Sequence, residues 1–223
     1  MASILKVDKI RGTGLDSDTI SLDGSGNITI PKNITASGTT TFSGTFTAPG
    51  LSTVITNNTT GGTASELVFD LSMDTSYLYQ RYILEDVYSS GGGDIYWRSR
   101  RASDDTYFTG GSDYAYAYHY AATGGSSGSA SSGAAYGRLN GYGIGDESTE
   151  KRRWVIDIYD NATSGSQTHA LWRNSGHYNG GVCDEIGMSM ELATTTTNQW
   201  KMYNGSGGTL TYSGYVHYGI KRA

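Results

Sequence analysis

The stretch Arg153-Trp-Val-Ile-Asp-Ile-Tyr159 alternates large apolar residues with polar or smaller ones. Successive side chains of a β-strand point to opposite faces of the sheet, so Trp154, Ile156 and Ile158 would share one face. The pattern predicts a strand with one side in a hydrophobic core and the other toward solvent. A shorter alternation places Ile95 and Trp97 on one face of a second strand.

Further segments between residues 62 and 223 are rich in aromatic and β-branched residues and are bounded by turn clusters such as Ser89-Ser-Gly-Gly-Gly93. This composition is typical of strands. We expect strands at 67–71, 77–88, 94–98, 113–121, 135–139, 153–159, 169–172, 182–192, 199–203, 209–212 and 214–220. Helical periodicity is not visible. Short strands at this spacing predict an all-β domain over residues 62–223, a β-sandwich or jelly roll.

The composition narrows the class of protein. The chain has 223 residues with 32 Gly, 18 Tyr, one Cys and a net charge of −5. A single cysteine excludes a disulfide framework, and the negative charge argues against nucleic acid as a partner, because phosphate binding draws on basic patches. No apolar run approaches the roughly 20 residues that span a bilayer, so membrane insertion is not expected.

Residues 1–61 differ from the rest of the chain. From Thr19 to Thr56, β-branched runs of a few residues are separated by turn residues. Such strands bury too little surface to offset the ordering of their backbone, about 1 to 2 kcal/mol per residue, so they need other chains. We expect a thin β segment that is intertwined with identical copies around a common axis or docked on a partner. The apolar residues expected at the interface between the copies are Ile28, Ile30, Ile34, Phe42 and Phe46. A flexible linker is the alternative.

Tyrosines alternate with small residues in Tyr114-Ala-Tyr-Ala-Tyr-His-Tyr120. In a strand the tyrosines share one face. Such a stripe suits a core or subunit interface, and it also suits stacking on sugar rings, because each ring is flat and apolar with a hydroxyl tip. The candidate glycan-stacking residues are Trp97, Tyr114, Tyr116, Tyr118 and Tyr120. The following segment 124–133, of Gly, Ser and Ala only, predicts a mobile exposed loop.

Residues that could support catalysis are scattered. The four histidines show no metal-ligand spacing, and no metal centre or cofactor is expected. The 21 acidic residues could supply a pair of glycosidase carboxylates, but nothing in their spacing pairs them. Cys183 lies in an apolar strand and is expected to be a buried residue rather than a nucleophile. We therefore expect a non-enzymatic protein, with polysaccharide hydrolysis as the remaining alternative.

Two groups of motifs resemble a known class. Met-Ala-Ser-Ile-Leu-Lys-Val-Asp-Lys-Ile at residues 1–10 and Asn-Ile-Thr-Ile-Pro-Lys-Asn-Ile-Thr at 27–35 resemble N-terminal segments of virion structural proteins from tailed bacteriophages, cyanophages above all. Tyr-Ile-Leu-Glu-Asp-Val-Tyr at 82–88, Asp-Ile-Tyr-Trp-Arg-Ser at 94–99 and the closing strands resemble a jelly-roll module of phage fibres and head decorations.

The resemblance implies a homotrimeric protein made in the host cytoplasm and displayed on the particle surface. The expected role is a capsid decoration, cement or head-fibre protein that binds the major capsid protein or another virion protein. The docking candidates are the apolar residues of the opening segment, Ile4, Leu5, Val7 and Ile10. The alternative is a short tail fibre whose C-terminal domain binds a host surface glycan.

Overall fold

The computed structural model describes residues 9–10, 20–22, 28–29, 52–178 and 180–221. The chain divides into two compact units, Met1–Ser43 and Gly44–Ala223. In the first unit, β1 (Lys9–Ile10), β2 (Ile20–Leu22) and β3 (Ile28–Thr29) form a three-stranded antiparallel sheet of order β1-β2-β3. The short β-branched runs near Ile20 and Ile28 thus form strands as predicted.

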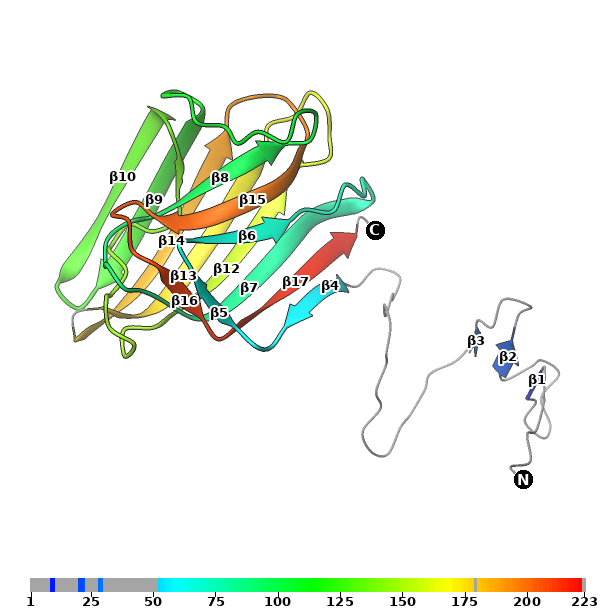
Figure 1. The fold of residues 1–223 in the computed structure, drawn as a ribbon, viewed down its shortest axis with the longest axis horizontal. Coiled ribbons are helices and arrows are strands. Elements are labelled where there is room, and N and C mark those ends of the chain that lie inside the picture. Colours follow the sequence, from blue (N-terminus) through cyan, green and yellow to red (C-terminus); the bar gives the residue numbers. More distant parts are fainter. Residues whose placement is uncertain (1–8, 11–19, 23–27, 30–51, 179, 222–223) are drawn as a thin grey trace. The chain divides into compact units, whose positions relative to one another are not determined.

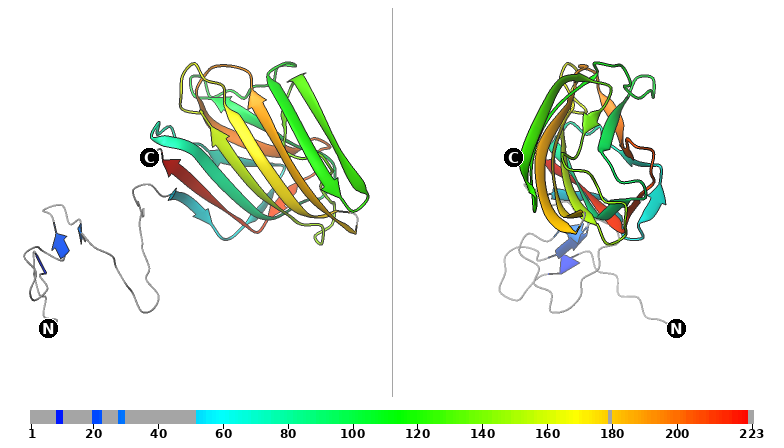
Figure 2. Two further views of the ribbon diagram at one scale, coloured as in Figure 1. Left: turned by 180° about the vertical axis from the view of Figure 1, so that it is seen from behind. Right: turned by 90° about the vertical axis from the view of Figure 1, so that its left-hand side faces the viewer.

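The second unit is a sandwich of two antiparallel sheets (Figure 1). The strands of the larger sheet are β4 (Ser52–Asn58), β5 (Gly62–Ala64), β7 (Tyr77–Ser89), β9 (Tyr114–Ala122), β10 (Gly125–Ala134), β12 (Arg152–Tyr159), β13 (His169–Tyr178), β14 (Gly181–Glu191), β16 (Leu210–Tyr212) and β17 (Gly214–Lys221). Those of the smaller sheet are β6 (Glu66–Asp70), β8 (Ile95–Arg101), β11 (Gly137–Arg138) and β15 (Thr197–Asn204). The all-β expectation is confirmed, and the two sheets face each other as two layers (Figure 2).

The order of the larger sheet is β10-β9-β14-β13-β12-β7, after which β7 pairs with both β17 and β16. The change of partner coincides with a β-bulge, since the register of β7 against β12 shifts by one residue between Leu84 and Val87. Asp86 lies within the bulge at a φ of 54°. Strand β4 pairs with β17, so the sandwich begins ahead of residue 62, where the sequence analysis placed the start of the domain.

The smaller sheet has the order β11-β8-β15-β6 and covers part of one face of the larger sheet. Trp97, Trp154 and Trp200 are all fully buried in one core cluster. Trp200 of β15 stacks on Phe69 of β6 at 4.4 Å between ring centroids. The alternation in 153–159 is confirmed, since Trp154, Ile156 and Ile158 are buried while the residues between them are more exposed.

Candidate functional site: the inner face of the edge hairpin

The β9–β10 hairpin lies at one edge of the larger sheet (Figure 1). The sequence analysis predicted a loop at 124–133, and that prediction is wrong: Gly125–Ala134 is a strand, although an exposed one. It forms because Gly, Ser and Ala fit opposite the larger residues of β9 with no steric conflict, and the antiparallel ladder satisfies one side of its backbone.

Tyrosine and serine side chains share the inner face of this hairpin. The directly opposed pairs are Tyr116 with Ser131, Tyr118 with Ser129 and Tyr120 with Ser127. Opposed residues of an antiparallel pair point to the same face, so these six residues form two parallel rows, here called the tyrosine–serine face. Its tyrosines are half-buried, whereas Ser127 and Ser129 are exposed.

The aromatic rings continue in one row beyond β9. The rings of Tyr116 and Tyr118 are nearly parallel, at 18°, with centroids 6.2 Å apart. Tyr120 contacts Tyr142 at 5.0 Å, and Tyr142 contacts Tyr178 at 5.0 Å. The row offers flat apolar area bordered by hydroxyl groups, which is the chemistry that binds the faces and the hydroxyl groups of a sugar ring.

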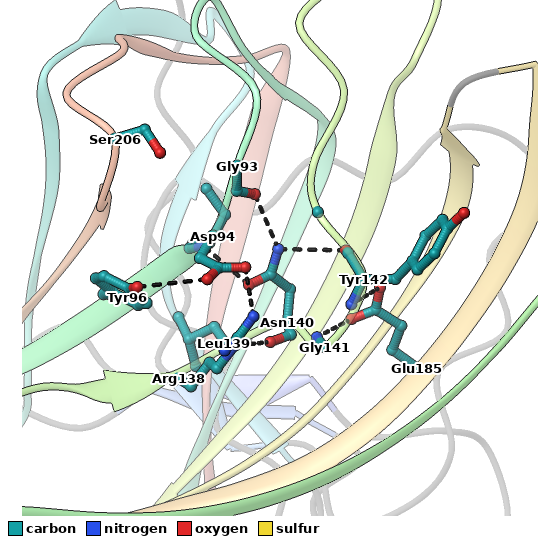
Figure 3. Close-up of polar contacts among 12 residues, drawn as sticks. Gly93, Asp94, Tyr96, Arg138, Leu139, Asn140, Gly141, Tyr142, Glu185 and Ser206 are labelled. Carbon is teal, nitrogen blue, oxygen red and sulfur yellow. Dashed lines mark hydrogen bonds and ion pairs between the residues drawn. The ribbon is translucent and has the colours of Figure 1, made fainter. Parts of the chain in front are cut away.

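A charged pair lies beside these rings. The guanidinium carbon of Arg138 lies 5.0 Å from the ring centroid of Tyr118. The same guanidinium forms an ion pair with Asp94, and its Nε donates to the backbone oxygen of Asn140 at 2.7 Å (Figure 3). Both side chains of the ion pair are partly exposed. They add a hydrogen-bond donor and an acceptor next to the tyrosine–serine face.

The segment 139–143 packs against the tyrosine rings of β9. The amide of Asn140 is fully buried, and it accepts from Ile95 N at 2.8 Å and donates to Gly93 O and Tyr142 O (Figure 3). Gly141 lies against the tyrosine rings so closely that a Cβ there would be 2.3 Å from the ring of Tyr118. Only glycine permits this approach, so the segment fixes the position of that ring.

A buried ion pair holds the same segment from the other side. Arg152 Nη1 lies 2.6 Å from Glu185 Oε1, and both side chains are fully buried. Glu185 accepts from Gly141 N at 2.6 Å and from Tyr142 N at 3.1 Å (Figure 3). Arg152 Nη2 in turn donates to Gly143 O at 2.5 Å. The charges are therefore compensated by each other and by backbone groups of one loop.

Asn174 completes this network. Its Oδ1 accepts from Arg152 Nη1 at 3.1 Å, and its Nδ2 donates to Glu185 Oε2 at 3.2 Å. The sequence analysis singled out neither Arg152 nor Asn174, and it considered Glu185 only as one of the acidic residues that could supply a glycosidase carboxylate. The sequence did contain a signal for a buried charge. Arg152 lies two residues before Trp154 and so occupies an inward-facing position of the strand, where an apolar residue is expected.

The structure divides the candidate glycan-stacking residues. Tyr116, Tyr118 and Tyr120 lie together on the tyrosine–serine face. Trp97 and Tyr114 are fully buried and 5.5 Å apart in the core, so their rings cannot stack on a ligand, and the expectation is wrong for these two. Burial raises the pKa of the Tyr114 hydroxyl, which accepts a hydrogen bond from Ser99 N at 3.0 Å.

The N-terminal candidates lie largely beyond the described residues. Ile10 is in β1 and Ile28 is in β3. The docking candidates Ile4, Leu5 and Val7 and the interface candidates Ile30, Ile34, Phe42 and Phe46 lie outside the described residues.

Two other side chains that could take part in chemistry, Cys183 and His217, are buried at separate places in the sandwich. Cys183 is buried, as predicted, and burial raises the pKa of its thiol. His217 is buried within 2.9 Å of Gln80 Oε1, and burial lowers its pKa to about 4. Within the described ranges, no three His, Cys, Asp or Glu side chains are grouped as metal ligands. The same part of the chain has no helix of sufficient length and apolarity to cross a bilayer.

No protein-family model matches the chain, and no curated protein matches it significantly.

Proposed function

We propose that the chain is a non-enzymatic structural protein of a tailed-phage particle, a trimeric capsid decoration or head-fibre protein whose sandwich is displayed on the particle surface. The N-terminal motifs that resemble phage segments support this proposal. The division of the chain into a small unit of short strands and a larger sandwich supports it as well, since particle docking and display need separate parts.

The observation that carries the oligomeric part of the proposal is an apolar patch on the outer face of the larger sheet. Leu171 of β13 lies directly opposite Met188 of β14, and Ile186 follows on the same face of β14. All three side chains are exposed, Ile186 by 61%. Contiguous apolar area on a soluble protein marks a contact surface more often than a solvated one. We assign it to contacts between copies of the chain.

Mass measurement by light scattering tests the trimer. We expect masses that are multiples of three chains for the full-length protein and loss of these masses for Met188→Glu, because Met188 lies between Leu171 and Ala117 and a carboxylate there is left desolvated and unpaired. Ser175→Glu is the matched control, since Ser175 is exposed on the neighbouring strand β13 and adds the same charge. A monomeric full-length chain would refute the proposed assembly.

Particle binding is tested separately. Deletion of residues 1–18 should release the protein from particles while leaving its assembly intact. Particles that retain full occupancy would refute docking through this segment.

A second candidate function rests on a different observation. The tyrosine–serine face, with Arg138 and Asp94 beside it, supports binding of a host surface glycan by a short tail fibre. A glycan array probed with the full chain tests this. Tyr116→Ala should lower the affinity of any selective glycan about tenfold, which corresponds to about 1.4 kcal/mol. Tyr79→Ala is the control, because Tyr79 pairs with Tyr159 on other strands. Absence of selective binding by the unmodified chain would refute it.

A further inference from the structure

Strand β10 forms an open edge of the larger sheet. It is ten residues long, and among the described residues it is hydrogen-bonded only to β9, on one side. Proteins usually protect such edges with lysine, proline, a bulge or a short strand. The stretch 121–135 contains neither a charged residue nor a proline, and the register shift of β10 falls near its end, between Ser131 and Ala134. The first seven residues of β10 are therefore an unprotected edge.

The ladder determines which backbone groups of β10 point outward. Thr123 N donates to Val182 O at 3.1 Å, and odd-numbered residues of β9 bond toward β14 in the same way. The backbone groups of even-numbered β9 residues therefore bond toward β10. The carbonyl oxygen of Tyr118 agrees with this, because it points toward β10 and would lie 2.6 Å from a Cβ placed on Gly128. The residues opposite them, such as Ser127 and Ser129, bond inward. The N–H and C=O groups of Ser126, Gly128 and Ala130 consequently point away from the sheet.

We propose that β10 pairs antiparallel with β10 of a second copy about a two-fold axis, which joins two larger sheets edge to edge. Two identical strands related by such an axis are antiparallel, and each supplies both donors and acceptors. The neutrality of β10 is the argument for a second copy, because self-pairing places a strand against its own sequence and would set any charge near a like charge. This pairing does not depend on the proposed phage role or on the outer apolar patch.

The small side chains of β10 also allow a second strand to approach without steric conflict. Gly128 and Ala130 lie on one face of the strand and Ser127 and Ser129 on the other, so no large side chain lies beside the junction on either face. The pairing would also place the two tyrosine–serine faces next to each other on one surface.

Amide hydrogen exchange of the full chain at rising protein concentration tests the proposal. We expect the amides of Ser126, Gly128 and Ala130 to gain at least tenfold protection as the concentration rises, while those of Ser127 and Ser129 are protected throughout. Fast exchange at Ser126, Gly128 and Ala130 at every concentration would overturn the proposal. Concentration-dependent protection of β4 as large as that of β10 would overturn it as well, because β4 is another edge strand of the larger sheet and that result would mean pairing of β10 with β4.

Ala130→Pro removes one outward N–H and leaves the β9 ladder in place, since proline is tolerated on an edge strand with its nitrogen toward solvent. It should abolish the concentration-dependent protection, whereas Ala130→Ser, which keeps the N–H, should not. Retained protection of the Tyr116 and Tyr118 amides reports that the hairpin is folded. Met188→Glu should leave the β10 effect unchanged, so failure of the trimer and failure of the strand pairing are separable. An Ala130→Pro variant with unchanged protection would contradict the pairing.

Discussion

Substitution of Glu185 by glutamine tests whether the buried ion pair positions the 139–143 segment. Glu185 and Arg152 are fully buried at 2.6 Å, and the two oxygens of Glu185 accept from Tyr142 N and Gly141 N. The glutamine is nearly isosteric but leaves the Arg152 charge uncompensated, and removal of one partner of a buried pair costs about 3 to 5 kcal/mol. Part of that loss arises because the amide nitrogen cannot accept, so one backbone N–H loses its partner at about 1 to 3 kcal/mol.

Urea unfolding at pH 7, followed by circular dichroism, measures the change in the free energy of unfolding. The matched control is Asp184→Asn on the same strand, because Asp184 pairs with Arg173 at 2.8 Å with both side chains more than half exposed. Exposed pairs contribute about 0 to 1 kcal/mol, so the control should change stability by less than about 1 kcal/mol.

The double variant Arg152→Met with Glu185→Gln separates charge burial from shape. It contains no uncompensated buried charge, so we expect it to be at least as stable as Glu185→Gln alone. A Glu185→Gln loss below about 1 kcal/mol, or simple addition of the two single effects, would refute the reasoning that the pair is desolvated and coupled.

Three further predictions concern buried groups. Burial lowers the pKa of His217 from 6.5 to about 4, so as the pH falls the unfolded chain takes up this proton before the folded chain does. The free energy of unfolding should therefore fall by up to about 3 kcal/mol from pH 6.5 to pH 4, and melting curves of His217→Phe should lack this fall. Burial raises the pKa of Glu191 from 4.5 to about 7, so its contribution is complete below pH 4.5 and lost as the pH rises through 7; Glu191→Gln should be more stable than the unmodified chain at pH 8 and equal to it at pH 4. A Cβ on Gly137 would lie 1.6 Å from Trp97 Nε1, so Gly137→Ala should cost about 1 to 3 kcal/mol in urea unfolding, and an unchanged midpoint would contradict that contact.

Most strands of the sandwich were predictable because their alternation is local. The sequence alone places β12 from its apolar residues at every second position, and β7, β14 and β17 follow from similar runs of aromatic and β-branched residues. Strand β10 was not predictable in this way. Its Gly, Ser and Ala residues have no apolar alternation, and it is a strand because β9 lies beside it.

The candidate site was predictable only in part, for a similar reason. Alternation placed Tyr116, Tyr118 and Tyr120 on one face, but it could not separate them from Tyr114, which has the same phase. The difference depends on how far the smaller sheet extends over the larger one. Trp97 of β8 covers Tyr114, whereas the later tyrosines of β9 remain half exposed.

The extent of the smaller sheet also explains why the charged network of Arg152 and Glu185 lies beyond its end. At the centre of the sandwich, apolar side chains such as Trp97, Trp154 and Trp200 fill most of the space between the two sheets. Beside β9 the smaller sheet ends at β11, and the chain then crosses over the larger sheet as the 139–143 segment, whose backbone N–H and C=O groups would be buried without partners. Arg152 and Glu185 meet those groups with both a donor and an acceptor. An apolar pair of the same volume would fill the space but leave the backbone groups unsatisfied, so the ion pair is retained here for the loop, and through Gly141 for the position of Tyr118.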